Sequence, residues 1–259
     1  MLYTVLKERQ PPPPRSRDMA ASKDKKRDPK ASLALLWGEQ EQPRRGPKPS
    51  LTAERIVAGA IAIADAEGLD AVSMQRVAAD LGVTTMALYR YFPGKAELTD
   101  LMVDSALGVP SGSVADADGW RAGLTEWARQ CWAIYRRHPW ILTAAAMRRQ
   151  LMGPNQLAWL DAALAALAPA GLTAAQQHDT VLLVIGHIRS LAQQLVHADE
   201  EGNEEWNRLA AEVLERHGHR FPALAAAIAA GAFDPQHGDP LDFGLERILD
   251  GVAHLIDHP

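Results

Sequence analysis

The sequence predicts an all-α protein with two folded parts. Alanine dominates the composition, and clusters of β-branched residues bounded by turn signals are scarce. Apolar residues recur at helical spacing between Gly and Pro breakers along most of the chain. With 259 residues, of which 47% are hydrophobic, the chain is long enough for one large core or two smaller ones.

Several classes of protein are disfavoured by what the sequence lacks. No apolar run approaches the roughly 18 residues that span a bilayer, and the N-terminus has no apolar signal segment, so we expect a cytoplasmic protein without a membrane partner. The single cysteine, Cys131, cannot form an internal disulfide and fits a reducing compartment. There is no Gly-rich phosphate loop, nucleophile elbow or pair of carboxylates on an apolar face, so nothing indicates an enzyme.

Residues 1–49 form a basic N-terminal extension that composition predicts to be largely disordered. Residues 1–32 are rich in Pro and Lys and contain little apolar sequence. An apolar island at residues 33–38 interrupts the extension. We expect this island to dock on the folded part, because exposing Trp37 beside three leucines is costly.

Basic charge is concentrated in this extension. Residues 1–48 hold 12 Lys or Arg and 6 Asp or Glu, whereas the whole chain has a net charge of −5. Arg44, Arg45 and Lys48 lie a few residues before the first strong helical pattern, where an arm could enter the minor groove of DNA. A solvated tail without a DNA contact is the alternative.

Residues 50–107, which we call the head, are expected to contain four helices. Thr52, Ser73 and Thr84 are suitable N-caps, and a fourth helix opens at Lys95 after the Pro93-Gly94 break. The side chains expected to face a core recur at helical spacing: Ile56, Val57, Ala60, Ile61, Ala64, Met74, Val77, Ala78, Leu81, Leu88, Phe92, Leu98, Leu101, Met102 and Ala106.

The second and third of these helices form a helix-turn-helix pattern. They meet at the Leu81-Gly82-Val83 corner, and the helix after it is short, polar and aromatic. An α-helix fits the major groove, and the side chains near its N-terminus contact base edges. A helical packing unit with half-buried tyrosines is the alternative interpretation.

Residue types along this segment suit DNA contacts. Short Thr side chains let a helix approach closely, apolar side chains can meet thymine methyl groups, and Tyr, Arg and Lys can bind phosphate. A helix N-terminus at Lys95 would face a phosphate as well. The candidate DNA contacts in the head are Thr52, Gln75, Thr84, Thr85, Met86, Ala87, Tyr89, Arg90, Tyr91 and Lys95.

Residues 52–103 resemble the N-terminal domain of the tetracycline-repressor (TetR) family of bacterial regulators. The family's Leu-Tyr-x-x-Phe-x-x-Lys motif is present as Leu88-Tyr89-Arg90-Tyr91-Phe92-Pro93-Gly94-Lys95. The resemblance implies an all-α homodimer with two DNA-binding heads and a larger ligand-binding body. It places base and phosphate contacts at Gln75, Thr85, Met86, Ala87, Tyr89, Arg90, Tyr91 and Lys95. Tyr91 departs from the family pattern, which often has His there.

Residues 119–257, which we call the body, are expected to form a bundle of seven helices after a linker of small residues. Breakers such as Pro139, Gly153-Pro154 and Gly202 separate them. The expected helices are 119–138, 139–151, 155–168, 173–199, 203–217, 221–231 and 241–256.

Aromatic and sulfur-containing side chains of the body are candidates for an apolar ligand site. Trp127, Cys131 and Tyr135 are spaced four apart and share one helix face, and further large side chains follow closely. Packing in the core is the alternative for each of them. Polar residues on apolar helices are further candidates, because a buried polar group needs a partner. The ligand candidates are Trp127, Cys131, Tyr135, Trp140, Met147, Met152, Trp159, His187 and Gln193.

Neither a metal nor a cofactor is expected. The pairs His217/His219 and His254/His258 lie near helix ends without a carboxylate or Cys at metal-site spacing. Cys131 lies on an apolar face, and no second cysteine could resolve its oxidation.

The helices at 173–199 and 241–256 are the most continuously apolar, which favours a four-helix dimer interface. Together these features predict a DNA-binding transcription regulator. The leading hypothesis is a homodimeric repressor that a small hydrophobic effector releases from double-stranded, palindromic operator DNA. A non-inducible architectural DNA-binding protein is the alternative.

Overall fold

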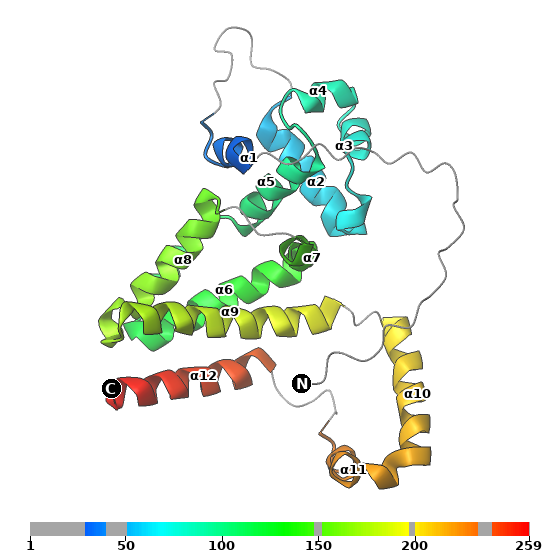
Figure 1. The fold of residues 1–259 in the computed structure, drawn as a ribbon, viewed down its shortest axis with the longest axis vertical. Helices are drawn as coiled ribbons and strands as arrows, with labels where there is room; N and C mark the ends of the chain where they lie inside the picture. The colour runs from blue at the N-terminus through cyan, green and yellow to red at the C-terminus, as the bar shows by residue number, and fades with distance from the viewer. Residues whose placement is uncertain (1–28, 40–50, 148–151, 197–199, 233–239, 259) are drawn as a thin grey trace, which may run out of the picture.

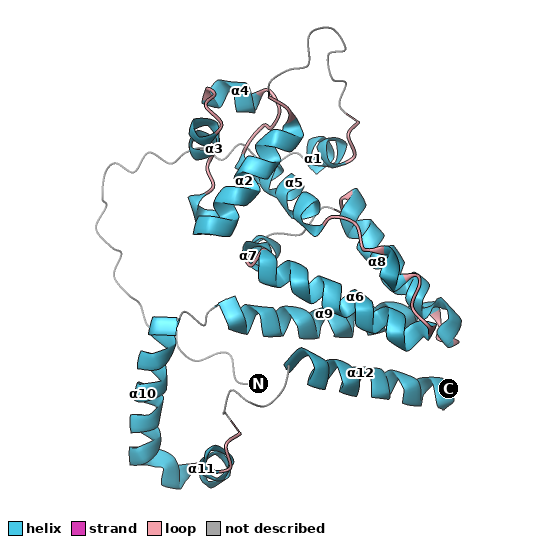
Figure 2. Ribbon diagram, turned by 180° about the vertical axis from the view of Figure 1, so that it is seen from behind, coloured by secondary structure: helices cyan, strands magenta, loops and turns pink. Residues whose placement is uncertain are grey.

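The computed structural model describes residues 29–39, 51–147, 152–196, 200–232 and 240–258, and every regular element in them is helical (Figures 1 and 2). The all-α expectation is therefore confirmed. No helix within these ranges is long and apolar enough to cross a membrane.

The head contains four α-helices and one short 3-10 helix, and three caps predicted from the sequence are present. Thr52 Oγ1 accepts from Arg55 N at 3.2 Å, and Ser73 Oγ accepts from Arg76 N at 3.1 Å. The elements are α2 (Ala53–Glu67), η1 (Leu69–Ala71), α3 (Met74–Asp80), α4 (Thr85–Tyr89) and α5 (Lys95–Leu107).

The corner between α3 and α4 depends on Gly82, whose φ of +67° lies in the left-handed region that favours glycine. Behind this corner Leu88 and Phe92 are completely buried. The inward face of α2 differs at one position from the sequence prediction, because Ile63 is buried and Ile61 is only partly buried.

An additional helix, α1 (Pro29–Leu36), lies beside α5 (Figure 1). Residues 29–32, which composition assigned to the disordered tail, therefore belong to a helix. The apolar island docks through Leu36, which is buried, and through Trp37, whose Nε1 donates to the carbonyl oxygen of Met152 at 3.3 Å. The expected burial of the island is only partial, because Leu33 stays 37% exposed and Trp37 stays 46% exposed. The rest of the extension lies outside the described residues.

The body follows the predicted order of helices closely. Its main layers are α6, α8, α9 and α12, while α10 and α11 stand away from them in both ribbon views (Figures 1 and 2). The elements are η2 (Gly112–Val114), α6 (Gly119–Arg137), α7 (Trp140–Met147), α8 (Pro154–Leu167), η3 (Ala168–Ala170), α9 (Ala174–Val196), α10 (Glu200–His217), η4 (Gly218–Arg220), α11 (Pro222–Ala229) and α12 (Pro240–Asp257).

Head and body share one continuous hydrophobic core, and polar contacts reinforce the joint between α5 and α8. The carboxylate of Asp104 accepts from Gln156 N at 3.0 Å and from Asn155 N at 3.4 Å, at the N-terminal end of α8. Burial raises the pKa of Asp104, and the two backbone N–H donors partly offset this effect. We call Asp104, Gly153, Asn155 and Gln156 the Asp104 junction.

Candidate DNA interface and effector site

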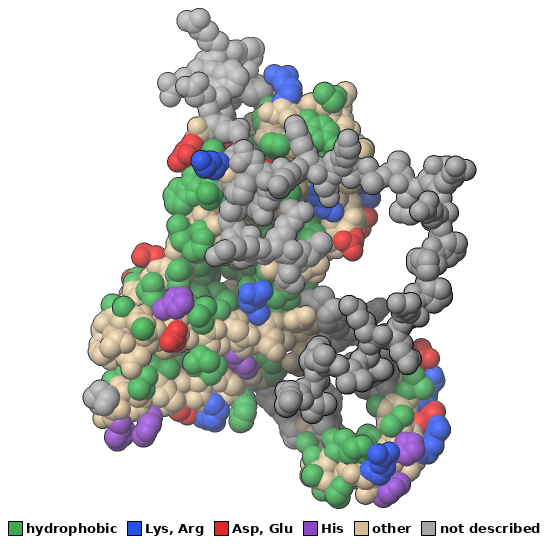
Figure 3. Space-filling model, in the orientation of Figure 1, with side chains coloured by type: hydrophobic (Ala, Val, Ile, Leu, Met, Phe, Trp, Pro, Cys, Tyr) green, Lys and Arg blue, Asp and Glu red, His purple; other side chains and the backbone are tan. Residues whose placement is uncertain are grey.

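The outer face of α4 presents the side chains that a DNA groove would meet. Met86 is 72% exposed and Tyr89 is 44% exposed, although both are large. Arg90 is exposed beside them, and hydrophobic and basic side chains lie at the surface around the outer end of the head (Figure 3). Large apolar groups held in water on a short helix favour a partner surface over a packing role.

The two threonines of the turn have different environments. Thr84 is exposed, and its Oγ1 accepts from Ala87 N at 3.3 Å, so its hydroxyl caps α4. Thr85 and Ala87 are partly buried on the same helix. Gln75 is exposed on α3, whereas the hydroxyl of Thr52 is used as the cap of α2.

Tyr91 and Lys95 each donate a hydrogen bond to a backbone carbonyl within the head. Tyr91 is half-buried, and its hydroxyl donates to the carbonyl oxygen of Leu51 at 2.7 Å, just before α2. A phosphate contact would require that same donor, so the geometry favours a structural role for Tyr91. Lys95 Nζ donates to the carbonyl oxygen of Leu69 at 3.1 Å and, as an ammonium with three N–H groups, keeps donors for a phosphate.

Replacing Tyr91 with phenylalanine is expected to lower the free energy of unfolding by about 1 kcal/mol, because the part-buried carbonyl of Leu51 loses its donor. Urea unfolding followed by circular dichroism measures this change. Tyr89→Phe is the matched control, since the Tyr89 hydroxyl has no hydrogen bond among the described residues. A Tyr91→Phe variant with unaltered stability and weakened DNA binding would contradict the structural role.

Arg44, Arg45 and Lys48 of the predicted basic arm lie outside the described residues. Their contact with DNA stays a prediction. Among the described basic residues near the candidate DNA interface, Arg76 is paired with Glu67 through two hydrogen bonds of 2.7 and 3.1 Å.

In the body, the structure brings together five of the nine ligand candidates within the buried core. Trp127, Cys131 and Tyr135 lie on the inward face of α6, and Trp140 and Trp159 are buried with them. The rings of Trp127 and Trp159 meet edge to face with centroids 6.2 Å apart. Burial raises the pKa of Cys131 far above its usual range and that of Tyr135 to about 12, so both side chains stay neutral.

The indole N–H groups of this cluster are all hydrogen-bonded. Trp127 Nε1 donates to the carbonyl oxygen of Trp159 at 2.8 Å, inside the body. Trp159 Nε1 donates to the carbonyl oxygens of Leu107 at 3.2 Å and Gly108 at 2.9 Å, at the end of α5. Trp140 Nε1 donates to Asp65 Oδ1 at 2.7 Å, on α2 of the head. Two of the aromatic ligand candidates therefore contact the end of the head that faces the body.

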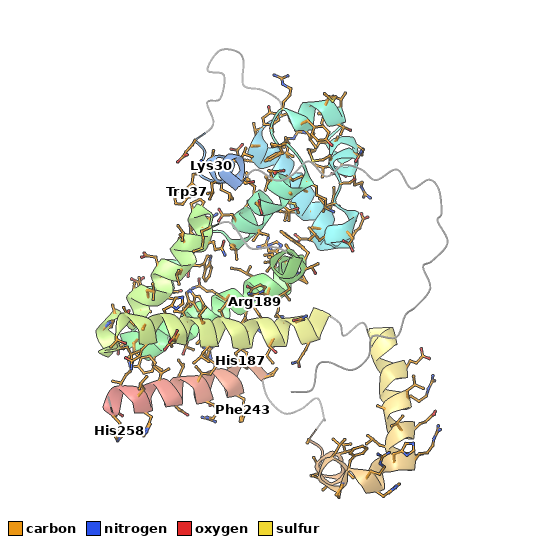
Figure 4. The ribbon with its side chains drawn as sticks, in the orientation of Figure 1. Lys30, Trp37, His187, Arg189, Phe243 and His258 are labelled. Atoms are coloured by element: carbon orange, nitrogen blue, oxygen red, sulfur yellow. The ribbon has the colours of Figure 1, made fainter. Side chains whose placement is uncertain are left out.

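The other four candidates do not join this cluster in what the structure describes. His187 faces α12, where its Nε2 lies 3.4 Å from the carbonyl oxygen of Leu241 (Figure 4). Gln193 and Met152 are exposed, and the side chain of Met147 lies outside the described part of the chain. A helical pattern shows that His187 is flanked by apolar residues, but not which neighbouring helix it faces.

Sequence reasoning missed Arg189, which lies on the side of α9 that faces α6 (Figure 4). Its charge is close enough to Tyr135 to oppose the rise in the pKa of that phenol. The only sequence signal was a lone cation within an apolar helix.

A groove among the described residues has a lining that includes no member of the aromatic cluster. It has a volume of about 400 Å³ between residues 110–119, the start of α6 and the second half of α8. Small side chains such as Ala115, Gly123 and Ala166 line it, and none of the predicted ligand residues does. Within the described ranges, no cluster of three or more His, Cys, Asp or Glu residues could hold a metal ion.

Comparison with known proteins agrees with both parts of the fold. Residues 56–102 match the family model for bacterial regulatory proteins of the tetR family, and residues 114–256 match the tetracycline repressor-like C-terminal domain. These matches place the chain in the class of helix-turn-helix DNA-binding transcription regulators. Because the C-terminal model alone spans more than half of the chain, the protein belongs to the TetR family, whose members are regulators and not enzymes.

Relatives and solved structures extend this likeness over most of the chain. The HTH-type transcriptional repressor DrrR1 of Streptomyces coeruleorubidus is 40% identical over 235 residues, which are 87% of this chain and 86% of that protein. An HTH-type transcriptional regulator of Saccharopolyspora erythraea is 30% identical over 84% of this chain and 91% of its own.

The TetR family protein ActR of Streptomyces coelicolor has a similar fold. Its crystal structure in complex with actinorhodin has a TM-score of 0.66 and 26% sequence identity, covering 78% of this chain and 95% of ActR.

Proposed function

We propose that the protein is a repressor that binds a palindromic operator and leaves it when a small, hydrophobic, aromatic molecule binds the body. The observation that carries the DNA part is the exposed face of α4, where Met86 and Tyr89 project from a helix whose cap and core contacts are satisfied elsewhere. On this proposal Thr85, Met86 and Ala87 contact bases, and Gln75, Tyr89, Arg90 and Lys95 contact phosphates or base edges. Action on chromosomal DNA would place the protein in the cytoplasm.

The effector part rests on the aromatic cluster of α6, α7 and α8. Its flat side chains suit a planar organic molecule, and Arg189 adds a positive charge near Tyr135. The name of DrrR1 as a repressor and the complex of ActR with actinorhodin support the same interpretation for this chain.

The operator's symmetry follows from a proposed homodimer through α9 and α12. These helices pack against each other and still leave large apolar side chains in water: Leu183 is 60% exposed and Phe243 is 69% exposed. A second copy of the chain that covers them would form a four-helix interface and present two heads to two half-sites.

An electrophoretic mobility shift with DNA flanking the protein's own gene tests the proposal. We expect a sequence-specific shift at low salt that actinorhodin or another planar aromatic compound in a panel reverses. The absence of any shift at low salt would contradict DNA binding. A shift with little sequence selectivity and no response to any compound would favour the architectural alternative.

A further inference from the structure

The carboxylate of Asp65 joins the head to the body through two hydrogen bonds to a single oxygen. Asp65 lies on α2, close to its end, and its Oδ1 is 2.6 Å from His138 Nδ1 and 2.7 Å from Trp140 Nε1. An indole N–H can only donate, and a carboxylate oxygen accepts from both rings, so His138 carries its proton on Nδ1. We call these three residues the Asp65 junction.

Both donors are held firmly by the body. His138 is 7% exposed and Trp140 is 4% exposed, and their rings lie edge to face with centroids 6.1 Å apart. The backbone of His138 closes α6 through a bond to Ile134 O and starts α7 by accepting from Ile141 N. The junction therefore fixes α2 to the turn between α6 and α7. These two helices set the position of that turn.

Because Asp65 lies near one end of α2, its contact with the body restrains rotation of the whole helix. With 15 residues, α2 is about 22 Å long, and its opposite end carries the Thr52 cap and Leu51, the acceptor for Tyr91 of the helix-turn-helix. A rotation of α2 about its Asp65 end would therefore displace the DNA-facing end of the head by several ångströms. The Asp104 junction holds a second helix of the same head, so the two contacts together restrict rotation.

From this geometry we propose that Asp65 is a positioning residue that sets the orientation of the head on the body and, in the dimer, the half-site spacing that the protein accepts. The inference rests on the proposed homodimer bound to a palindromic operator. Without the Asp65 junction each head can sample a wider range of angles. Binding to the best operator then weakens, and operators with altered spacing are penalised less.

The test uses the full-length chain and duplexes built from the half-site that wild-type protein selects from random DNA. Spacers are set at the preferred length and one base pair longer or shorter, and dissociation constants are measured by fluorescence anisotropy. Wild-type protein should discriminate against the altered spacers by about tenfold or more. Asp65→Ala should bind the preferred operator about tenfold more weakly and lose most of that discrimination.

Three comparisons distinguish a loss of head positioning from a general loss of folding or of DNA binding. A duplex with one half-site should bind Asp65→Ala and wild type within about twofold, because the reading helix is unchanged. Asp65→Asn, which keeps an acceptor oxygen, should recover the spacing preference. Asp70→Ala removes an exposed carboxylate of η1 in the same head and should behave as wild type.

If Asp65→Ala does not fold, Trp140→Phe replaces the indole with a smaller aromatic ring that has no N–H donor, and it should relax the spacing preference in the same direction. An unchanged spacing preference in the folded variants would overturn the proposal. Failure of wild-type protein to select any DNA would instead overturn the proposed function, so the two failures are distinguishable.

Discussion

Gly153→Ala is expected to lower the free energy of unfolding by about 2 kcal/mol and to loosen the head from the body. A Cβ at this position would lie 2.2 Å from Asp104 Oδ1 and 2.4 Å from its Cγ. The backbone of Gly153 is extended, with φ of −77°, so the cost comes from the collision and not from the backbone conformation. Asp104 is buried and short, and it can withdraw only by giving up its bonds to the N-terminal end of α8.

Urea unfolding of Gly153→Ala, Asp104→Ala and the double variant isolates the contact between Gly153 and Asp104. Asp104→Ala alone removes the same hydrogen bonds, so adding Gly153→Ala to it should cost much less than Gly153→Ala costs in wild type. Strictly additive losses would show that Gly153 and Asp104 do not interact as the structure indicates.

Gly244→Ala is expected to separate α12 from α9 and to weaken the proposed dimer by about tenfold. The imidazole of His187 packs directly over Gly244, and a Cβ there would lie 2.2 Å from His187 Cε1 and 2.3 Å from Nε2. The ring is partly buried between two helices, so it has to leave the interface or push α12 outward. Either movement displaces the surface that carries Phe243.

Sedimentation equilibrium over a range of protein concentrations measures the effect on the dimer. The double variant His187→Ala/Gly244→Ala removes the obstructing ring and should recover most of the wild-type dimer affinity. If the double variant dissociates as readily as Gly244→Ala, the packing of His187 on Gly244 does not govern this interface.

Local signals explain why the order and bounds of the helices were predictable from the sequence. Caps such as Ser73 and breakers such as Gly82 act within a few residues, and the structure has them where the sequence placed them. The error at residues 29–32 has the opposite cause. Their polar composition favours disorder, but α1 is stabilised by contacts with α5 and Met152 that are distant in sequence.

The candidate sites were predictable by residue type but not by orientation. Helical spacing identified the aromatic face of α6, because periodicity alone defines which residues share a face. It could not show that Tyr91 donates to a carbonyl 40 residues away, or that His187 faces α12. Asp65 gave no signal at all, since its partners lie 73 and 75 residues further along the chain.

We expect α4 to read operator DNA through its exposed face. The most direct test is a comparison of Tyr89→Ala and Thr85→Ala on the selected operator and on a scrambled duplex of equal length. Tyr89→Ala removes a proposed phosphate contact and should weaken binding to both duplexes about equally, whereas Thr85→Ala should mainly reduce the preference for the operator. Binding of both variants with wild-type affinity and selectivity would contradict the assignment of α4 to the groove.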